Sequence, residues 1–190
     1  KALVGKDMSS SDEFTFSITQ VESAGSDKVV KNRVETTHNN GNFVQFPNNI
    51  DFLQYTLDDA GKTYYYMIKE DSTGDDAVSK DETKYWISVS ITDNGNGTLD
   101  VKPVSINKDG TELTLDEDEQ NVQFFVNKKT NEILTGLTEA EVLDNADLEL
   151  LQVEGYDAFR FAFINKYTSE GHVDLKFEKI LENKTLADND

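Results

Sequence analysis

The sequence predicts an all-β protein: an immunoglobulin-like antiparallel sandwich with one short helical insertion. Short segments that alternate apolar and polar residues recur along most of the chain, turn residues separate them, and a single segment has apolar residues at helical spacing. Alternation with period two is what a strand with one buried face requires. Many such strands with frequent turns are typical of a sandwich.

The first half of the chain contains three expected strands. Residues 13–19 (EFTFSIT) place Phe14 and Phe16 on one face, and residues 39–46 (NNGNFVQF) have turn residues followed by a strand. Residues 63–70 (TYYYMIKE) form an aromatic strand. One face of this strand carries Tyr64, Tyr66, Ile68 and Glu70.

The second half contains four more strands and the helix. Residues 84–92 alternate and lead, through an Asn-Gly hairpin turn, into a returning strand within 93–106. Residues 121–128 and 156–167 are the last two strands. The helix is expected within 137–151, where two residues have capping-box spacing and apolar residues follow at helical intervals. These residues are Thr138 and Glu141 for the box, and Ala140, Leu143, Ala146 and Leu150 for the apolar series.

Composition narrows the classes of function. The chain has 37 acidic and 18 basic residues, a formal charge of −19, which disfavours binding to nucleic acid or to anionic membranes. It has no cysteine and no apolar run long enough to span a bilayer, and its two histidines disfavour a metalloenzyme or a histidine-dependent hydrolase. We therefore expect no cofactor. Residues 93–100 (DNGNGTLD) resemble a calcium loop, but Gly95 and Gly97 occupy ligand positions, so a hairpin turn is favoured.

Three polar residues are expected on apolar faces. Glu70 shares a face with Tyr66 and Ile68, and Asn165 shares one with Phe159, Phe161, Phe163 and Tyr167. Lys1 lies on the same side of its segment as Leu3. Burying a charge or an amide is costly unless the group finds a partner.

The three side chains together indicate one chemistry. A desolvated lysine has a lowered pKa and can be a neutral nucleophile, whereas a desolvated glutamic acid has a raised pKa and can donate a proton. The acid can polarise the Asn165 carboxamide while the Lys1 amine attacks it and expels ammonia. The product is a Lys–Asn isopeptide bond that forms once in each molecule. Asn127, in FFVNKKT, is a rival acceptor.

The motifs around these residues resemble the isopeptide-linkage domain of Gram-positive pilins of the streptococcal T-antigen-like type. The matching stretches, in order, are KALVG (1–5), FTF (14–16), YYYMIKE (64–70), YWISVSITDNGNGTLDV (85–101) and FINKY (163–167). The resemblance implies that Lys1 is the nucleophile, Glu70 the acid and base, and Asn165 the acceptor. We expect Phe14, Phe16, Tyr66, Ile68, Phe161 and Phe163 to surround the bond. The long stretch 105–155 departs from the family pattern.

The domain is expected to span residues 1–168. Residues 169–190 are interpreted as a linker and the first strand of a following, truncated repeat, because Lys179 lies on an apolar face as Lys1 does. On this interpretation the chain starts late in its own first repeat, and the tail strand can add to a neighbouring molecule.

The resulting hypothesis is a structural module of a pilus or adhesin stalk, extracellular and anchored to the cell wall of a Gram-positive bacterium, rather than an enzyme. Its expected partners are neighbouring repeats or pilin subunits. The alternative is an adhesin module without a cross-link that binds a host protein or glycan. A third interpretation is a carbohydrate-binding module that uses Tyr65 or Trp86 as an aromatic platform.

Overall fold

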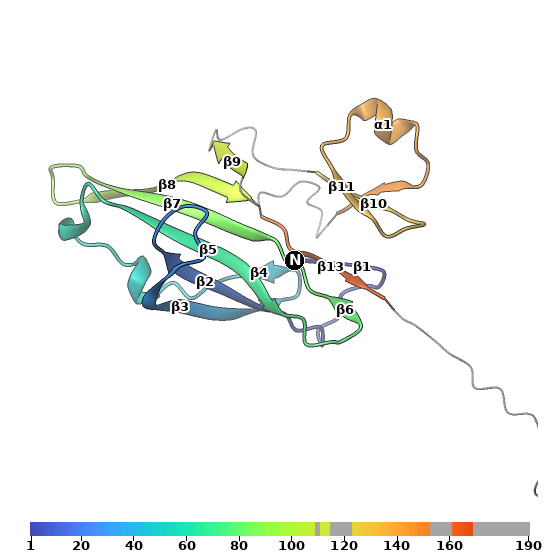
Figure 1. The fold of residues 1–190 in the computed structure, drawn as a ribbon, viewed down its shortest axis with the longest axis horizontal. Coiled ribbons are helices and arrows are strands. Elements are labelled where there is room, and N and C mark those ends of the chain that lie inside the picture. The colour runs from blue at the N-terminus through green and yellow to red at the C-terminus, as the bar shows by residue number, and fades with distance from the viewer. Residues whose placement is uncertain (109–110, 115–122, 153–160, 169–190) are drawn as a thin grey trace, which may run out of the picture.

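The computed structural model describes residues 1–108, 111–114, 123–152 and 161–168, and these are almost entirely strands (Figure 1). The largest sheet has seven antiparallel strands in the order β4-β3-β2-β5-β7-β8-β9. Their bounds are β2 Thr15–Val21, β3 Val29–Asn40, β4 Phe43–Val44, β5 Thr63–Ser72, β7 Lys84–Asp93, β8 Leu99–Lys108 and β9 Thr111–Thr114. The all-β sandwich predicted from the sequence is confirmed.

Two three-stranded sheets complete the fold. The first has the order β1-β13-β6, and the second has the order β11-β10-β12. Their bounds are β1 Ala2–Val4, β6 Val78–Ser79, β13 Ile164–Tyr167, β10 Phe124–Asn127, β11 Ile133–Thr135 and β12 Leu148–Leu150. In the first of these sheets β1 runs parallel to β13, so segments from opposite ends of the domain lie side by side.

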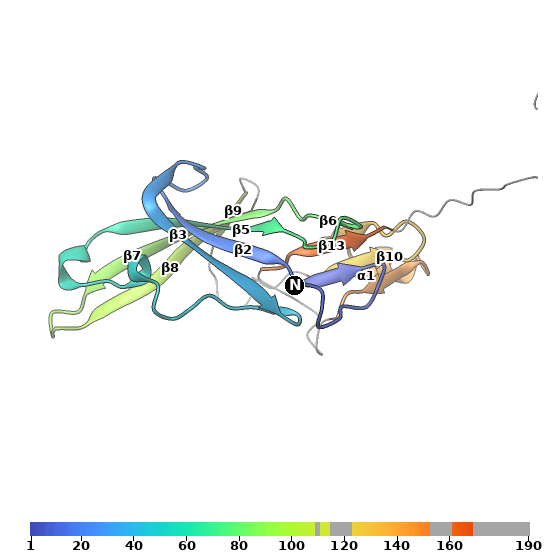
Figure 2. The same ribbon diagram turned by 90° about the horizontal axis from the view of Figure 1, so that it is seen from below.

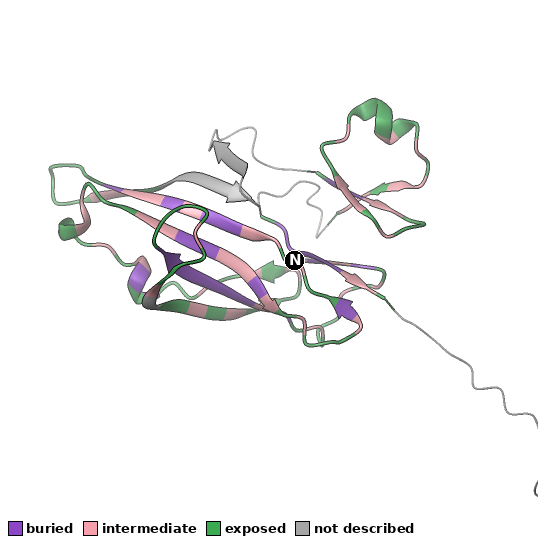
Figure 3. Ribbon diagram, in the orientation of Figure 1, coloured by how far each residue is buried: buried purple, intermediate pink, exposed green. Residues whose placement is uncertain are grey.

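The β1–β13 pair lies between two apolar clusters. On one side, Phe163 packs with Phe14, Phe16, Val78 and Tyr85 against the large sheet. On the other side, Ala2, Val4, Ala162 and Ile164 pack with Phe124 of β10, and Figure 2 shows β10 alongside this pair. This arrangement follows from alternation, because successive residues of a strand point to opposite faces. Figure 3 shows buried residues on β1 and, in the large sheet, on β2, β5 and β7.

A separate cluster fills the other end of the sandwich. It contains Ile18, Tyr66 and Ile50 together with Phe52, which lies on the short 3-10 helix η1 (Asp51–Leu53). A second 3-10 helix, η2 (Leu57–Asp59), begins with a capping box at Thr56. Among the described residues, no helix has the length and apolar character needed to cross a membrane.

The helical insertion is shorter than predicted. Helix α1 spans Glu139–Leu143 and has the expected capping box between Thr138 and Glu141. The chain then turns, because Asn145 accepts a hydrogen bond from the backbone N–H of Asp147, and residues 148–150 form β12 instead of a second helical turn. Asn and Asp favour such local hydrogen bonds over helix continuation.

The boundaries of several strands also differ from those predicted. The long strand β3 was not predicted as a strand before residue 39, because its sequence VVKNRVETTHNN has no apolar alternation. Of the strand expected at 156–167, residues 164–167 form β13, residues 161–163 precede it without strand structure, and residues 153–160 lie outside the described residues. The proposed second repeat at 169–190, including Lys179, also lies outside them.

Candidate functional site

Lys1 enters the site from the start of β1. Ala2 and Val4 pack toward β10, so the side chain of Lys1 turns toward the large sheet. That side chain is 0 % exposed, and its Nζ lies 3.9 Å above the centroid of the Phe14 ring. Burial lowers the pKa of Lys1 from 10.5 to about 8, against the opposing effect of the Glu70 carboxylate.

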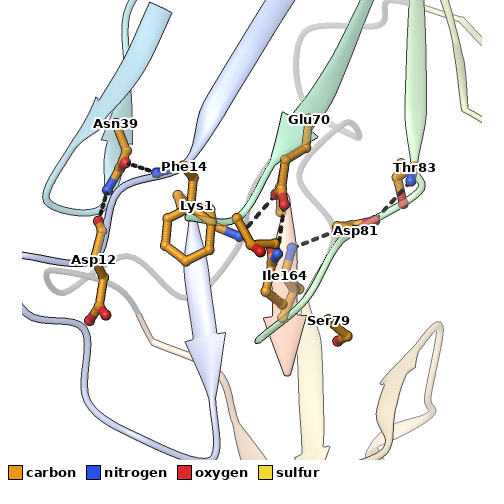
Figure 4. A network of polar contacts seen from close by, with 12 residues as sticks. Lys1, Asp12, Phe14, Asn39, Glu70, Ser79, Asp81, Thr83 and Ile164 are labelled. Atoms are coloured by element: carbon orange, nitrogen blue, oxygen red, sulfur yellow. Dashed lines mark hydrogen bonds and ion pairs between the residues drawn. The ribbon is translucent and has the colours of Figure 1, made fainter. Parts of the chain in front are cut away.

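Glu70 is the centre of the site. It lies on β5, opposite Phe16 of β2, and is 1 % exposed. Its Oε2 is 3.1 Å from Nζ of Lys1, and its Oε1 accepts a hydrogen bond of 2.7 Å from Nδ2 of Asn165. Burial raises the pKa of Glu70, and the positive charge of Lys1 opposes that shift. Figure 4 shows the Glu70 carboxylate and the Lys1 amine pointing toward each other beside the Phe14 ring.

Asn165 completes a row of three polar groups. It is 0 % exposed and lies on β13 directly opposite Leu3 of the parallel neighbour β1. Its Nδ2 donates to Glu70, whereas its Oδ1 has no hydrogen-bond partner among the described residues. A buried amide oxygen without a donor costs roughly 1–3 kcal/mol. The structure therefore brings together the three residues that the sequence singled out, with one carboxylate bridging the two nitrogen atoms.

Aromatic rings enclose this row. Phe16 and Phe163 lie with ring centroids 5.1 Å apart, and Tyr85 contacts the edge of Phe163 at 5.3 Å. Together with Phe14 they exclude water and lower the local dielectric, which strengthens electrostatic interactions within the site.

Three of the expected surrounding residues lie differently. Phe161 is 37 % exposed and contacts Tyr85 at the rim. Tyr66 belongs to the cluster at the other end of the sandwich, where its hydroxyl donates to the backbone oxygen of Phe52. Ile68 is half-buried between the two clusters. Face alternation places Tyr66 and Glu70 on the same side of β5, but they are four residues apart along the strand and so reach different clusters.

Two further residues at the site were not predicted to act there, although Tyr85 opens the matching stretch 85–101. Asp81, between β6 and β7, accepts hydrogen bonds from the backbone N–H groups of Ile164 at 2.6 Å and Thr83 at 2.8 Å. The hydroxyl of Tyr85 donates to the backbone oxygen of Ala162 and accepts from its N–H. Both side chains bind backbone atoms, so no residue pattern reveals their targets.

The alternative sites have ordinary structural roles. Asn127, the rival acceptor, caps a turn after β10, where its Oδ1 accepts from the N–H groups of Lys129 and Thr130. Of the two candidates for an aromatic platform, Trp86 is buried with Val21 and Met67, and Tyr65 packs against the same cluster. Residues 93–98 form a hairpin turn, closed by a hydrogen bond from the N–H of Asn94 to the oxygen of Thr98. The described part of the chain contains no cluster of His, Cys, Asp or Glu suited to a metal ion.

Comparison with known proteins adds one match. The family model for the Spy0128-like isopeptide containing domain (FctA) matches residues 1–130, about two thirds of the chain. No curated protein and no solved structure matched the chain. The matched range includes Lys1 and Glu70, and Asn165 lies beyond it.

Proposed function

Because the chain belongs to the family of Spy0128-like isopeptide containing domains, we propose that it is a stalk module of a Gram-positive pilus or adhesin whose Lys1 and Asn165 become covalently joined with the help of Glu70. Membership of this family makes the chain a structural domain of the pilin type rather than an enzyme. One observation supports the covalent step most directly: the buried Glu70 carboxylate contacts both nitrogen atoms that the reaction exchanges.

The reaction begins with a proton transfer. Burial favours the neutral forms of both partners, so a proton moves from the Lys1 ammonium to the Glu70 carboxylate. The neutral Nζ then attacks Cγ of Asn165 and forms a new C–N bond. Glu70 gives its proton to Nδ2, the C–Nδ2 bond breaks, and Glu70 takes a proton from the attacking nitrogen. One ammonia leaves, and Glu70 is left holding one proton, which passes to the departing ammonia or to solvent to restore the carboxylate.

The surroundings of Asn165 support the same step. Its Oδ1 has no hydrogen-bond partner among the described residues, and a half-turn of the amide would place this oxygen against the protonated Glu70 carboxyl. A hydrogen bond there polarises the carbonyl and stabilises the oxyanion that forms on attack. The aromatic shell keeps out the water that would compete with Lys1 as nucleophile.

The proposed bond explains the position of the site. It would join β1 to β13, which are neighbours in one sheet and come from opposite ends of the domain. Tension applied to the two ends of the domain would then pass through a covalent link instead of peeling strands from the large sheet. Neighbouring pilin subunits or repeats are the expected partners, and we retain residues 169–190 with Lys179 as the start of a second repeat.

The test is the intact mass of the denatured protein, compared with that of a Glu70→Ala variant. The wild-type protein is expected to be lighter than its sequence by one ammonia, whereas the variant keeps its full mass. Peptide mapping should then recover a branched peptide that contains Lys1 and Asn165, and no branch at Asn127. Full mass in the folded wild-type protein refutes the proposal.

A further inference from the structure

Strand β13, which carries the proposed acceptor, lies between β1 and β6, and along its edge toward β6 most of its backbone hydrogen bonds are made with side chains. The backbone of β6 pairs with β13 only at Lys166 and Tyr167, beyond Asn165. Upstream of these residues, the N–H of Ile164 donates to the carboxylate of Asp81 instead, at 2.6 Å. Ile164 immediately precedes Asn165, so this hydrogen bond lies one residue from the proposed acceptor.

The same carboxylate is tied to the large sheet. Its second oxygen accepts a hydrogen bond of 2.8 Å from the N–H of Thr83, the residue before β7. Figure 4 shows Asp81 between Ile164 and Thr83, beside Lys1 and Glu70. Asp81 therefore links the start of β7 to the acceptor strand through two hydrogen bonds that a single carboxyl group accepts.

The register of β13 determines which side chain faces Glu70. A shift of one residue would turn Asn165 away and present Ile164 or Lys166, because side chains alternate between faces. The short strand has four residues, so each hydrogen bond that holds its register carries a large share of the constraint.

We propose that Asp81 is a positioning residue for the cross-linking reaction: by holding the N–H of Ile164, it fixes β13 in the register that presents the Asn165 carboxamide to Glu70 and Lys1. This inference rests on the proposed function, because it assigns a role in that reaction. Asp81 touches neither reacting nitrogen in the structure, and its effect is transmitted through the backbone of Ile164.

The experiment follows folding and ammonia loss separately. The full chain is recovered unfolded in urea from inclusion bodies and diluted into buffer, where ammonia loss is followed by intact mass. Folding is followed by the fluorescence of Trp86, the single tryptophan, which is buried in the large sheet. The variants are Asp81→Ala and Asp81→Asn, and the matched control is Asp75→Ala. Asp75 makes the same kind of turn, with its Oδ1 accepting from the N–H of Ala77 at 2.8 Å, but its carboxylate has no hydrogen bond to β13.

Asp81→Ala is expected to fold and yet to lose ammonia about 10- to 100-fold more slowly than wild type, the range that corresponds to one hydrogen bond to a charged group. Asp81→Asn keeps one acceptor oxygen and should recover part of the rate, whereas Asp75→Ala should react as wild type does. The alkaline limit of the pH–rate profile should also move to lower pH in Asp81→Asn, because the Asp81 charge raises the pKa of Lys1. A purely structural role would slow folding without changing the rate of ammonia loss per folded molecule.

Three results would overturn the inference. If folded Asp81→Ala loses ammonia at the wild-type rate, Asp81 does not position the acceptor. If Asp81→Ala does not fold, Asp81→Leu, which has a similar branched shape and no acceptor oxygen, decides the same comparison, and a wild-type rate there has the same meaning. If the folded wild-type chain loses no ammonia, the proposed function itself fails, and the inference fails with it.

Discussion

Replacing Asn165 with alanine removes the proposed acceptor but leaves the contact between Lys1 and Glu70 in place. The cross-link would close a loop from residue 1 to residue 165. Treated in the same way as a disulfide that closes a loop of this length, it stabilises the fold by roughly 5 kcal/mol through restriction of the unfolded chain. For a domain of this size that corresponds to a fall in Tm of about 10–20 °C in the variant. The lost hydrogen bond to Glu70 adds roughly 1 kcal/mol.

Thermal unfolding by circular dichroism measures this difference, and intact mass verifies the state of the bond in each sample. Asn127→Ala is the matched control, since Asn127 caps an exposed turn and should keep the cross-link. We expect the control to lose only a few degrees, in line with roughly 1 kcal/mol for a lost capping group. The urea m-value should rise in Asn165→Ala alone, because an unlinked chain exposes more surface on unfolding. If wild type lacks one ammonia but Asn165→Ala melts with the control, the loop-closure argument is wrong.

Three further predictions concern pH and backbone geometry. Burial lowers the pKa of the free Lys1 amine from 10.5 to about 8, and Asn165→Ala keeps that amine free, so the unfolded variant should bind more protons than the folded one between these values. Urea titrations of the variant should therefore show a free energy of unfolding that is up to about 3 kcal/mol larger at pH 10 than at pH 7.5, and the linked wild type should show no such increase. Equal changes in both proteins contradict the lowered pKa of Lys1 as the cause. The rate of ammonia loss on refolding should be bell-shaped in pH, because the reaction needs one proton shared between Lys1 and Glu70. The rate should fall near pH 8, where Lys1 loses that proton to solvent and Glu70 can no longer become an acid; on the acid side it should fall above the ordinary pKa of a glutamate, where Glu70 takes a proton from solvent and Lys1 stays charged. A rate that still rises at pH 10 is inconsistent with proton exchange through Glu70. Gly5→Ala should lower Tm by more than Gly25→Ala does. Both glycines have positive φ, but only at Gly5 would a new Cβ lie 2.7 Å from a backbone oxygen, that of Tyr167 at the end of β13. Equal losses in Tm would show that the chain relieves this crowding at no cost.

Period-two alternation was sufficient to predict the inward faces around the site. It placed Glu70 on the core face of its strand and Asn165 on the face of Phe163, and both side chains are buried. The same reasoning failed for the second half of the predicted helix, where Ala146 and Leu150 have helical spacing but Asn145 turns the chain into β12. A short series of apolar residues can fit the helical period of 3.6 and the strand period of 2 equally well, and local hydrogen bonds of Asn and Asp then decide between helix and strand.

Asp81 could not be predicted in the same way. Its neighbours in the sequence are polar, and its partner at the site is the backbone N–H of Ile164, 83 residues away. Any residue at position 164 other than proline would offer that N–H, so the residue types carry no information about the contact.

The sequence by itself determined the chemical inventory of this protein: a cysteine-free, acidic chain with a lysine, a glutamic acid and an asparagine on otherwise apolar strand faces. These are local properties, because the face on which a side chain lies depends only on its position along a strand. Only the tertiary structure decided that the three meet, since Glu70 contacts residues 69 and 95 positions away and β1 pairs in parallel with β13. Their pKa shifts also depend on the fold, because desolvation comes from burial among aromatic rings that three distant segments bring around them.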